Sequence, residues 1–491
     1  MTLYRCDVCN VFEYDSARGN SPTHVKPGTE PRDFPEDWVC PICSSDKTHL
    51  IPVPDYTAKE SSEIPVPDYK APISVKSSVS EPMRGYLAPW ERHFDETEFY
   101  LADIHTMATT GESIIEPMKT KNPVISWDEI LIKGAQIARI PRNSDVPVNT
   151  QTIIGPKAKY PLVIETPVYV THMSFGALSR EVKIALAQGS AAVKTAIGSG
   201  EGGILPEEKA YAYRYIFEYV PNRYSVTDEN LKTADAIEIK IGQSAEPGMG
   251  ARLPAEKVTA EIARIRGYPE GMDILSPASY EDIKNPDDLR EKVRWLREKS
   301  GGKPIGIKIA AGDIEEDLEA IFHAHPDFVT IDGRPGATGA ALKYIKASTS
   351  VPTIFALYRA RKFLDMHGEK NISLVMTGGF RISSDFAKGL ALGADAIAIG
   401  TAALMACACQ QYRMCHTGNC PVGVTTQKSD LRDRLKPEIS AKRLENFLRV
   451  STEELKDFAR LTGNDDVHAM NIKNLCTTST EISGYTGIRH V

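Results

Sequence analysis

The 491-residue chain lacks the features that mark membrane, secreted and nucleic-acid-binding proteins. Its longest apolar stretch, Ala394–Cys409, is interrupted by Asp395 and Gly400 and falls short of the ~20 residues that a membrane helix needs. No apolar segment follows Met1, so we expect no signal peptide. The net charge of -7 shows no basic excess, which argues against nucleic acid as a partner. We therefore expect a cytoplasmic protein without a membrane span that acts on a small-molecule substrate.

The cysteines do not have the distribution of a secreted disulfide framework. Eight of the 9 cysteines fall within two short windows, whereas disulfide-bonded domains spread theirs along the chain. In the first window, the C-x2-C pairs Cys6/Cys9 and Cys40/Cys43 are typical of one tetrahedral four-thiolate metal site. Redox iron and structural zinc are the two alternatives. The separation of Cys9 from Cys40 exceeds the roughly 15–20 residues of zinc ribbons, so iron is favoured.

The second window holds Cys409, Cys415 and Cys420 at C-x5-C-x4-C spacing, directly after a glycine-punctuated apolar run. Thiolates are the ligands that hold iron–sulfur clusters. This spacing therefore predicts a cluster and, with it, electron transfer. Cys407 and Cys476 are expected to be buried thiols rather than ligands.

The composition changes along the chain and indicates domain boundaries. After the second cysteine pair come the hexapeptide Ile51–Tyr56, its repeat Ile64–Tyr69 and a serine-rich stretch. Proline at this density prevents helix formation and favours extended geometry, which predicts a semi-rigid linker. The expected divisions are a metal domain over 1–50, the linker over 51–85, a lead-in segment over 86–160 and the main domain over 161–491.

From about residue 160, short apolar or β-branched runs alternate with helix-compatible segments. This pattern is typical of βα units on a parallel sheet. Eight such runs predict an α/β fold, a (β/α)8 TIM barrel. The expected strands are Pro167–Met173, Val193–Ile197, Ala236–Ile241, Pro304–Ile309, Phe328–Ile331, Pro352–Ala356, Ser373–Met376 and Ala396–Ile399. A ninth short run, Met272–Leu275, is assigned to an excursion from the barrel.

Two of the connecting segments carry clear helix signals. Leu289, Val293 and Leu296 recur at i, i+4 and i+7, which predicts a helix with one apolar face. Another helix is expected to begin with Ser383 or Ser384 as its N-cap and to end at Gly393, before the last strand.

Residues at the ends of the strands indicate an anion site. Gly378–Gly379 and Gly400–Thr401 follow the last two expected strands, where barrels of this kind usually bind phosphate. Each motif alone is an ordinary turn, but the two together favour a phosphate ligand. Lys308, a charge within an apolar strand, is a candidate cofactor or substrate contact. The alternatives are a lysine that extends to solvent and a pair with Asp332.

Residues 1–50 resemble rubredoxin. The resemblance rests on the two cysteine pairs, on Pro27–Thr29, on the stretch Phe34–Cys43 and on Lys47. It implies a mononuclear iron held by Cys6, Cys9, Cys40 and Cys43. Asn10 and Ser44 replace the glycines that are usual after each pair, a change that bears on the N–H to sulfur hydrogen bonds that tune the iron.

Residues from about 86 to the end resemble the FMN-binding synthase domain of glutamate synthase in its compact archaeal form. The matching stretches are His172–Ser179, Ser199–Gly203, Ile239–Gln243, Asp332–Gly333, Thr377–Gly379, Gly400–Ala402 and Cys409–Gln427. The resemblance implies an FMN bound by Met173, Ser174, Lys308, Gly378, Gly379, Gly400 and Thr401. It places Lys308 near the flavin N1, and it implies a [3Fe–4S] cluster on Cys409, Cys415 and Cys420.

The same resemblance implies a pocket for 2-oxoglutarate. Its residues are Glu201, Lys240, Gln243 and Arg266, with Glu201 and Lys308 as the catalytic groups. Two positions depart from the family pattern, because Glu246 stands where a lysine is usual and Tyr280–Glu281 stands where paired histidines are usual. At ~4 Å and an effective dielectric of ~20, reversing a charge turns an attraction of a few kcal/mol into repulsion. Either other residues compensate or the substrate differs.

The expected function is reductive amination of 2-oxoglutarate to L-glutamate by hydride from reduced FMN, with electrons relayed through the rubredoxin-like iron and the cluster. Alternatives are a different 2-oxo acid, an alkylamine in place of ammonia, or a non-aminating electron-transfer subunit of a larger complex. The chain has no room for an amidotransferase domain and carries Thr2 rather than an N-terminal cysteine nucleophile. Ammonia is thus expected from solvent or from a separate glutaminase subunit, and electrons from a donor subunit. An oligomer is compatible with these expectations.

Overall fold

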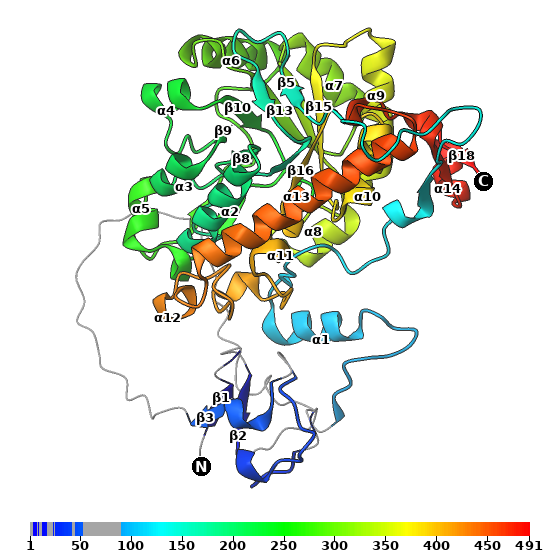
Figure 1. Cartoon of the computed structure of the whole chain (residues 1–491). Coiled ribbons are helices and arrows are strands. Elements are labelled where there is room, and N and C mark those ends of the chain that lie inside the picture. Colours follow the sequence, from blue (N-terminus) through cyan, green and yellow to red (C-terminus); the bar gives the residue numbers. More distant parts are fainter. Residues whose placement is uncertain are drawn as a thin grey trace. The chain divides into compact units, whose positions relative to one another are not determined.

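The computed structural model describes residues 3–6, 8, 12–16, 23, 25–41, 45–52 and 90–491. It divides into two compact units, Met1–Ile115 and Glu116–Val491 (Figure 1). Each unit has a hydrophobic core of its own. Cys9 and Cys43 lie outside the described residues, as does nearly all of the expected linker.

The first unit contains a three-stranded antiparallel sheet in the order β2-β1-β3. Its strands are β1 (Leu3–Cys6), β2 (Glu13–Asp15) and β3 (Leu50–Pro52). The register pairs Arg5 with Glu13 on one side of β1 and Cys6 with Leu50 on the other. The unit also contains the 3-10 helices η2 (Pro31–Asp33) and η3 (Lys47–His49) and the helix α1 (Leu101–Thr110).

Aromatic rings fill the core beside this sheet. The ring centroid of Phe34 lies 4.8 Å from that of Tyr14 and 5.0 Å from that of Trp38. A small domain has little apolar surface to bury, so large aromatic side chains contribute much of its stability. Cys6 and Cys40, the two described cysteines of the predicted metal site, belong to the same buried cluster.

The second unit is built on a closed barrel of eight parallel strands in the order β10-β13-β14-β15-β16-β7-β8-β9 (Figure 1). The strands are β7 (Val168–Val170), β8 (Ala196–Gly198), β9 (Arg214–Tyr219), β10 (Ala236–Lys240), β13 (Ile305–Ala310), β14 (Phe328–Asp332), β15 (Ser373–Thr377) and β16 (Ala396–Ile399). The expected (β/α)8 barrel is thus confirmed. The short pair β11 (Arg252–Leu253) and β12 (Ile274–Leu275) lies outside the barrel, as expected for the ninth run.

One strand expected from the sequence is wrong, and one strand of the barrel was not expected. The run Pro352–Ala356 is no strand, because helix α9 (Thr353–Met366) begins within it. A short apolar run reads the same in a strand and in the first turns of a buried helix. The third strand of the barrel is instead Arg214–Tyr219, in which the charge of Glu218 interrupts the apolar pattern.

The remaining helices surround the barrel. They are α2 (Arg180–Ala192), α3 (Pro206–Tyr211), α4 (Asp228–Thr233), α5 (Ala260–Arg266), α6 (Pro286–Lys299), α7 (Ile314–His323), α8 (Lys343–Ser348), α10 (Ser383–Ala391), α11 (Thr401–Cys407), α12 (Ser429–Arg432), α13 (Pro437–Leu461) and α14 (Thr480–Tyr485). The predicted apolar face of α6 is buried. Helix α10 begins at Ser383, one or two residues earlier than the two predicted N-caps imply, so Ile382 and not a serine is its N-cap.

The hairpin β5 (Thr152–Ile154) and β6 (Leu162–Ile164) closes the amino-terminal end of the barrel. Its residues Ile154, Leu162 and Ile164 are buried together with apolar side chains of the barrel strands. The opposite, carboxyl end of the strands is left open for a site.

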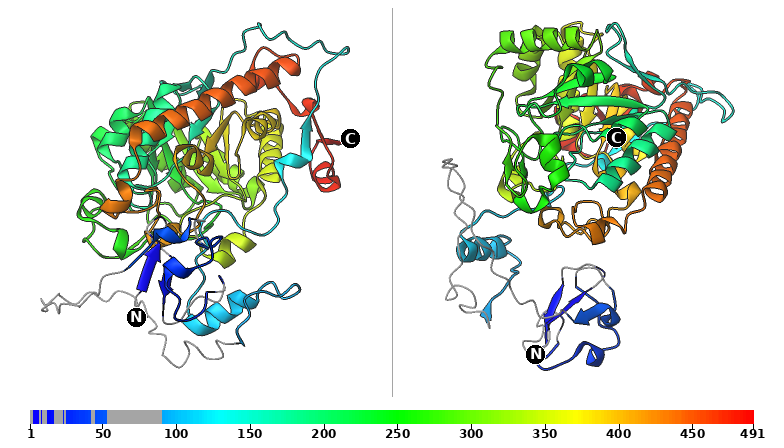
Figure 2. Two further views of the ribbon diagram at one scale, coloured as in Figure 1. Left: turned by 60° about the horizontal axis from the view of Figure 1, so that its bottom comes forward. Right: turned by 90° about the vertical axis from the view of Figure 1, so that its left-hand side faces the viewer.

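The 25-residue helix α13 packs along α2 on the outside of the barrel (Figures 1 and 2). Gly189 of α2 allows this close approach, because a Cβ there would lie 2.8 Å from the carbonyl oxygen of Ala441. A small sheet in the order β18-β17-β4, formed by Arg489–His490, Leu475–Thr477 and Ile130–Ile132, joins the two ends of this unit. Within the described residues, no helix is long and apolar enough to cross a membrane.

Candidate active site

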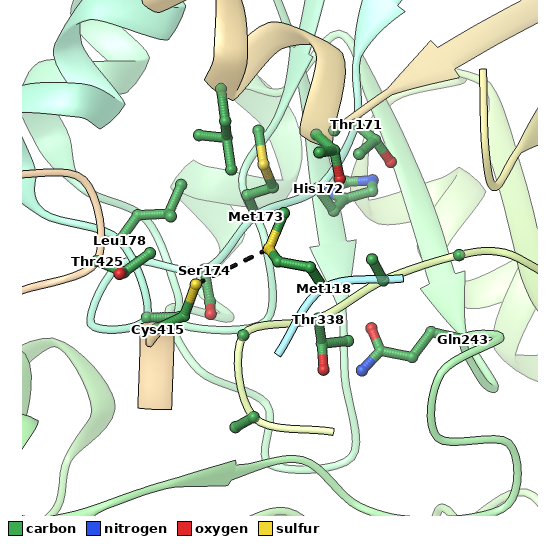
Figure 3. Close-up of a pocket in the computed structure, with 18 of the residues that line it drawn as sticks. Met118, Thr171, His172, Met173, Ser174, Leu178, Gln243, Thr338, Cys415 and Thr425 are labelled. Atoms are coloured by element: carbon green, nitrogen blue, oxygen red, sulfur yellow. Dashed lines mark hydrogen bonds between the residues drawn. The ribbon is translucent and has the colours of Figure 1, made fainter. Parts of the chain in front are cut away.

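A cavity of about 220 Å³ opens at the carboxyl ends of the barrel strands (Figure 3). Enzymes with this fold place their active sites there. Of the residues predicted from the sequence, the cavity brings together Met173, Ser174, Glu201, Lys240, Gln243, Lys308, Gly378, Gly379, Gly400, Thr401, Cys409, Cys415 and Cys420. Residues far apart in the sequence therefore share one site.

The backbone at Gly378 and Gly379 fits a bound anion. Both residues have left-handed φ values, 98° and 97°, and a Cβ at Gly378 would lie 2.0 Å from the carbonyl oxygen of Gly333. Only glycine fits this turn. On the same cavity, Gly400 precedes α11, and within the described part of the chain no side chain caps that helix. The first N–H groups of α11, starting at Thr401, therefore remain available to a ligand such as phosphate.

Lys308 lies inside the barrel, in register with Lys240 of the neighbouring strand. Its side chain is buried and does not extend to solvent, and its Nζ lies 3.8 Å from Oε1 of Glu218. Burial raises the pKa of Asp332, the other expected partner, and Lys308 opposes that rise. The Lys308 side chain is thus buried near the carboxyl groups of Glu218 and Asp332, and all three residues line the cavity.

Glu201 and Lys240 form an ion pair in the cavity wall. Burial alone would lower the pKa of the Lys240 ammonium, but Glu201 and then Glu218 raise it above its usual range. Lys240 therefore remains a cation over the working pH range. The pair also lines a second cavity of about 260 Å³.

Glu246 faces the first cavity from the loop after β10. Its two carboxylate oxygens accept hydrogen bonds from Gln243 Nε2 and Thr338 Oγ1, each at 3.0 Å. Burial raises the pKa of this carboxyl, and Lys240 opposes the rise. The carboxylate of Glu246 is thus held in place as part of the cavity wall.

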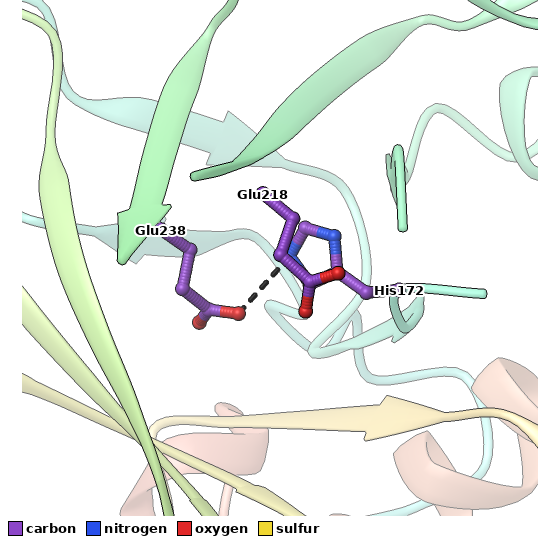
Figure 4. Close-up of side chains that lie close together, drawn as sticks. All are labelled: His172, Glu218 and Glu238. Atoms are coloured by element: carbon purple, nitrogen blue, oxygen red, sulfur yellow. Dashed lines mark ion pairs between the residues drawn. The ribbon is translucent and has the colours of Figure 1, made fainter. Parts of the chain in front are cut away.

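A histidine and two glutamates meet inside the barrel, where the sequence predicted no site (Figure 4). Nε2 of His172 lies 3.0 Å from Oε2 of Glu238, and Glu218 completes a buried group whose ligand atoms lie within 4.8 Å of one another. The N–H of Gly200 donates to Nδ1 of His172 at 3.2 Å, so the ring proton lies on Nε2, toward Glu238. Gly198 leaves room for the ring, because a Cβ there would lie 2.4 Å from Nδ1.

Lys183 of α2 bridges two loops of the site by hydrogen bonds. Its Nζ donates to the carbonyl oxygens of Met173 at 2.6 Å and Ser199 at 2.8 Å, and it pairs with Oε1 of Glu208 at 2.6 Å. Burial raises the pKa of Glu208 to about 7, although Lys183 opposes the rise. Lys183 thus positions the backbone after β7 and after β8.

The three cysteines of the loop after α11 line the cavity together. The backbone N–H of Gln411 and its Nε2 donate to Sγ of Cys409 at 3.5 Å and 3.2 Å. Burial raises the pKa of Cys409, and it raises that of Cys415 to about 11. Thiols in such surroundings ionise when a metal binds them. Three soft sulfur donors that line one cavity, the third from Cys420, fit an iron–sulfur cluster.

Lys257 is a residue of the site that the sequence did not reveal. Its buried Nζ donates to the carbonyl oxygens of Cys415 at 2.7 Å and Thr425 at 3.2 Å. Burial lowers its pKa to about 8, and the neighbouring thiols Cys415 and Cys420 oppose this. It lies in the excursion after β10, in the 3-10 helix Ala255–Lys257, so only the tertiary structure brings it to the cysteine loop.

Two residues that the sequence related to substrate binding lie elsewhere. Arg266 is absent from the lining of the first cavity, and its Nη2 donates to the carbonyl oxygen of Phe175 at 2.7 Å. Its contact with substrate stays a prediction. Tyr280 lies against Tyr219 with the ring planes 3° apart, and it lines the second cavity.

The residues that sequence reasoning missed differ in the signal they offered. Glu218 and Glu238 are charges within apolar strands, the same signal that singled out Lys308. Lys183 offered none, because a lysine at helical spacing is usually exposed.

Comparison with known families identifies the second unit. The family model described as a conserved region in glutamate synthase matches residues 114–465, more than half of the chain. The chain belongs to the glutamate synthase family. Residues 3–50 match the rubredoxin model, so a rubredoxin domain precedes the glutamate synthase barrel. Both resemblances read from the sequence are confirmed.

Curated glutamate synthases are similar over most of their length. The chain is 35% identical over 404 residues to a glutamate synthase large subunit-like protein of Rhizobium meliloti, covering 78% of this chain and 91% of that protein. It is 36% identical over 400 residues to the archaeal glutamate synthase (NADPH) of Methanocaldococcus jannaschii, covering 75% and 78%. It is 39% identical over 378 residues to the archaeal-type glutamate synthase (NADPH) of Dehalococcoides mccartyi, covering 73% and 75%. This glutamate synthase-type chain is an oxidoreductase.

Solved structures of lower similarity include a mandelate oxidase mutant with (S)-mandelic acid, at a TM-score of 0.46 and 15% identity, covering 72% of this chain and 87% of that one. A flavocytochrome b2 mutant with benzoylformate has a TM-score of 0.44 at 15% identity, covering 71% and 76%.

Proposed function

We propose that this chain is the synthase component of a glutamate synthase and that it reductively aminates 2-oxoglutarate to L-glutamate. The composition of one cavity supports the proposal. A glycine-rich anion cradle, a buried lysine, a paired carboxylate and ammonium, and three cysteine sulfurs all line it. Such a set joins redox chemistry to acid–base chemistry in a single site.

Groups of this chain that line the cavity would hold FMN. The N–H groups of Gly378, Gly379, Gly400 and Thr401 would bind its phosphate. The ammonium of Lys308 would stabilise negative charge near N1, and the backbone at Met173 and Ser174 would contact the ring. Bound FMN, when reduced, would supply hydride to the substrate carbon.

Electrons would reach the site through sulfur-bound iron. Cys409, Cys415 and Cys420 would hold a [3Fe–4S] cluster, and Cys6, Cys9, Cys40 and Cys43 would hold a mononuclear iron. The relay would run from the rubredoxin iron through the cluster to the flavin. Zinc in the N-terminal site would remove the first step, so the metal content of that domain is part of the proposal.

The substrate would bind on the side of the cavity formed by Glu201 and Lys240. The Lys240 ammonium and the amide of Gln243 would bind a carboxylate of the 2-oxo acid. Glu201 would accept a proton from the amine as its nitrogen attacks the 2-oxo carbon, and would return it as water leaves. The imine carbon formed in this way is the hydride acceptor. Ammonia would come from solvent or from a glutaminase subunit, and electrons from a donor subunit.

Flavin reoxidation tests this proposal. The reconstituted protein is reduced without oxygen and mixed with ammonium and 2-oxoglutarate while flavin absorbance and L-glutamate are followed. We expect reoxidation and glutamate only when both substrates are present. Reoxidation that is no faster than in the mixture without 2-oxoglutarate would reject the proposal.

Glu246 favours a second candidate, in which the site takes another 2-oxo acid or a primary alkylamine in place of ammonia. Its carboxylate in the cavity wall repels a second substrate carboxylate and attracts an alkylammonium ion. The same assay with methylammonium, and with monocarboxylic 2-oxo acids, distinguishes the two candidates. An FMN-loaded protein that no combination reoxidises would instead be a non-aminating electron-transfer subunit.

A further inference from the structure

Residues 116–121 lie outside every βα unit of the barrel, yet they reach the cavity. Met118 of this segment lines the cavity and is 5% exposed. Its Sδ lies 3.8 Å from Sγ of Cys415, and Figure 3 shows the two side chains pointing toward one another. The segment thus touches one of the sulfurs proposed to bind the cluster.

Two basic side chains hold the segment in place. Nζ of Lys346, itself buried, donates to the carbonyl oxygens of Met118 at 2.8 Å and of Glu116, and lies 2.8 Å from a carboxylate oxygen of Glu116. Arg413 of the cysteine loop donates to the carbonyl oxygen of Lys119 at 2.9 Å. The segment is therefore bound both to α8 and to the loop that carries the cysteines.

Met118 has a left-handed backbone conformation, with a φ of 69°. Residues other than glycine adopt this conformation rarely and at a cost in free energy, so surrounding contacts must impose it. The N–H of Met118 donates to the carbonyl oxygen of Thr338 at 2.8 Å, and Lys346 holds its carbonyl oxygen. Both main-chain polar groups of Met118 are thus fixed while its side chain points toward Cys415.

We propose that Met118 is a positioning residue that seals the iron–sulfur site, covering the Cys415 sulfur and keeping water and other hydrogen-bond donors away from the cluster. The inference rests on the proposed cluster at Cys409, Cys415 and Cys420. A thioether has no N–H or O–H to donate. Gln411 donates two hydrogen bonds to the sulfur of Cys409, and the hydroxyl of Thr425 acts on the sulfur of Cys415, where it opposes the rise in pKa that burial causes. On the side of Cys415 that Met118 covers, the thioether offers no donor.

Sealing has a definite electrostatic consequence. Reduction adds negative charge to a cluster, and hydrogen bonds or water at its sulfurs stabilise that charge and raise the reduction potential. Met118 withholds both from the side of Cys415 that it covers, so it keeps the potential lower than water or a donor at that position would. It also keeps dissolved oxidants from the cluster and slows the loss of iron.

Three substitutions at residue 118 of the full-length holoenzyme test the proposal. Met118→Leu keeps the volume without adding a donor, Met118→Ala opens space for water, and Met118→Gln brings an amide donor against Cys415. Met366→Ala, at an exposed position on α9, is the matched control. EPR-monitored redox titration measures the cluster potential, and decay of the cluster EPR signal in aerated buffer measures its lifetime.

We expect the Met118→Leu protein to match the wild type and the control. The Ala and Gln proteins should both show a more positive cluster potential, and the Ala protein should also lose its EPR signal faster. Wild-type potentials in both of these proteins would overturn the proposal. A Leu protein that shifts as far as the Ala protein would also overturn it, because the sulfur atom and not the seal would then set the potential. The Gln protein decides the question if the Ala protein does not fold. Absence of any iron–sulfur signal from the wild type would refute the proposed cofactor set, a failure that does not depend on residue 118.

Discussion

Lys183 and Glu208 form an ion pair, 2.6 Å between Nζ and Oε1, from which solvent is excluded. Lys183 also donates hydrogen bonds to the carbonyl oxygens of Met173 and Ser199. The residue that pairs with the buried Glu208 therefore also positions the active-site loops. A buried pair adds little net stability, but removing one partner leaves an uncompensated charge in a medium that solvates it poorly.

Removal of the lysine should therefore destabilise the protein. Lys183→Met is expected to lower the free energy of unfolding by about 3–5 kcal/mol and to reduce the FMN retained on purification. Urea denaturation and the flavin-to-protein absorbance ratio measure these effects. The double variant Lys183→Met/Glu208→Gln removes the stranded charge and should recover part of the stability. A single variant as stable as the wild type would contradict the role given to the pair.

Glu208 should make stability depend on pH. Burial raises its pKa from 4.5 to about 7, so between these values the folded protein holds a proton that the unfolded chain releases. The stability from this group is present below about pH 4.5 and is lost as the pH rises through about 7, by at most about 3 kcal/mol. Urea midpoints across this range should fall more for the wild type than for Glu208→Gln. Glu229→Gln, an exposed acid on α4, is the control and should keep the wild-type slope.

Charge at residue 246 should set the affinity for a dicarboxylate. Glu246→Lys replaces a carboxylate in the cavity wall with an ammonium, and we expect the Kd for 2-oxoglutarate to fall at least about tenfold, or ~1.4 kcal/mol. Glu246→Gln removes the charge without reversing it and should give an intermediate Kd. Isothermal titration calorimetry on the FMN-loaded protein measures all three. Affinities that do not follow the order Lys, Gln, Glu would show that Glu246 does not contact this substrate.

The turn at Gly378 should tolerate no side chain. Gly378→Ala would place a Cβ 2.0 Å from a backbone oxygen, and we expect loss of FMN binding together with a lower unfolding temperature. Gly368→Ala is the matched control, because Gly368 also has a positive φ but has open space around it, so only about 1 kcal/mol of backbone strain is expected. FMN content and thermal unfolding of both variants are compared. Equal FMN content would argue against a phosphate site at this turn.

The N-terminal cysteines should bind iron independently of the barrel. Cys40→Ser is expected to abolish the ferric tetrathiolate absorption and EPR signals while the flavin spectrum and the cluster signal remain. Cys476→Ser, in strand β17 and not a predicted ligand, should leave all three unchanged. Metal analysis that finds zinc in place of iron would remove the proposed entry point for electrons.

The barrel was largely predictable because its strands are short apolar runs separated by helical segments. The two errors came from residues whose surroundings are not local. Arg214–Tyr219 was missed because Glu218 is buried beside Lys308, a partner 90 residues away in the chain. The sequence of Pro352–Ala356 predicts a strand although the segment is helical, because a buried strand and the first turn of a buried helix have the same apolar pattern over so few residues.

Candidate ligand residues of the site could be predicted from local spacing. The cysteines of the two windows, the glycine pair Gly378–Gly379 and the lysine within strand β13 each depend on neighbours only a few residues away, and such spacing is written in the sequence. The sequence does not show which distant residues meet in the site. Met118 against Cys415, Lys183 beneath Met173 and Lys257 behind the cysteine loop are contacts between segments that only packing of the whole barrel brings together. The sequence around each of these residues gives no sign of its partner, because the partner belongs to a distant segment of the chain. These contacts could therefore be found only in the tertiary structure.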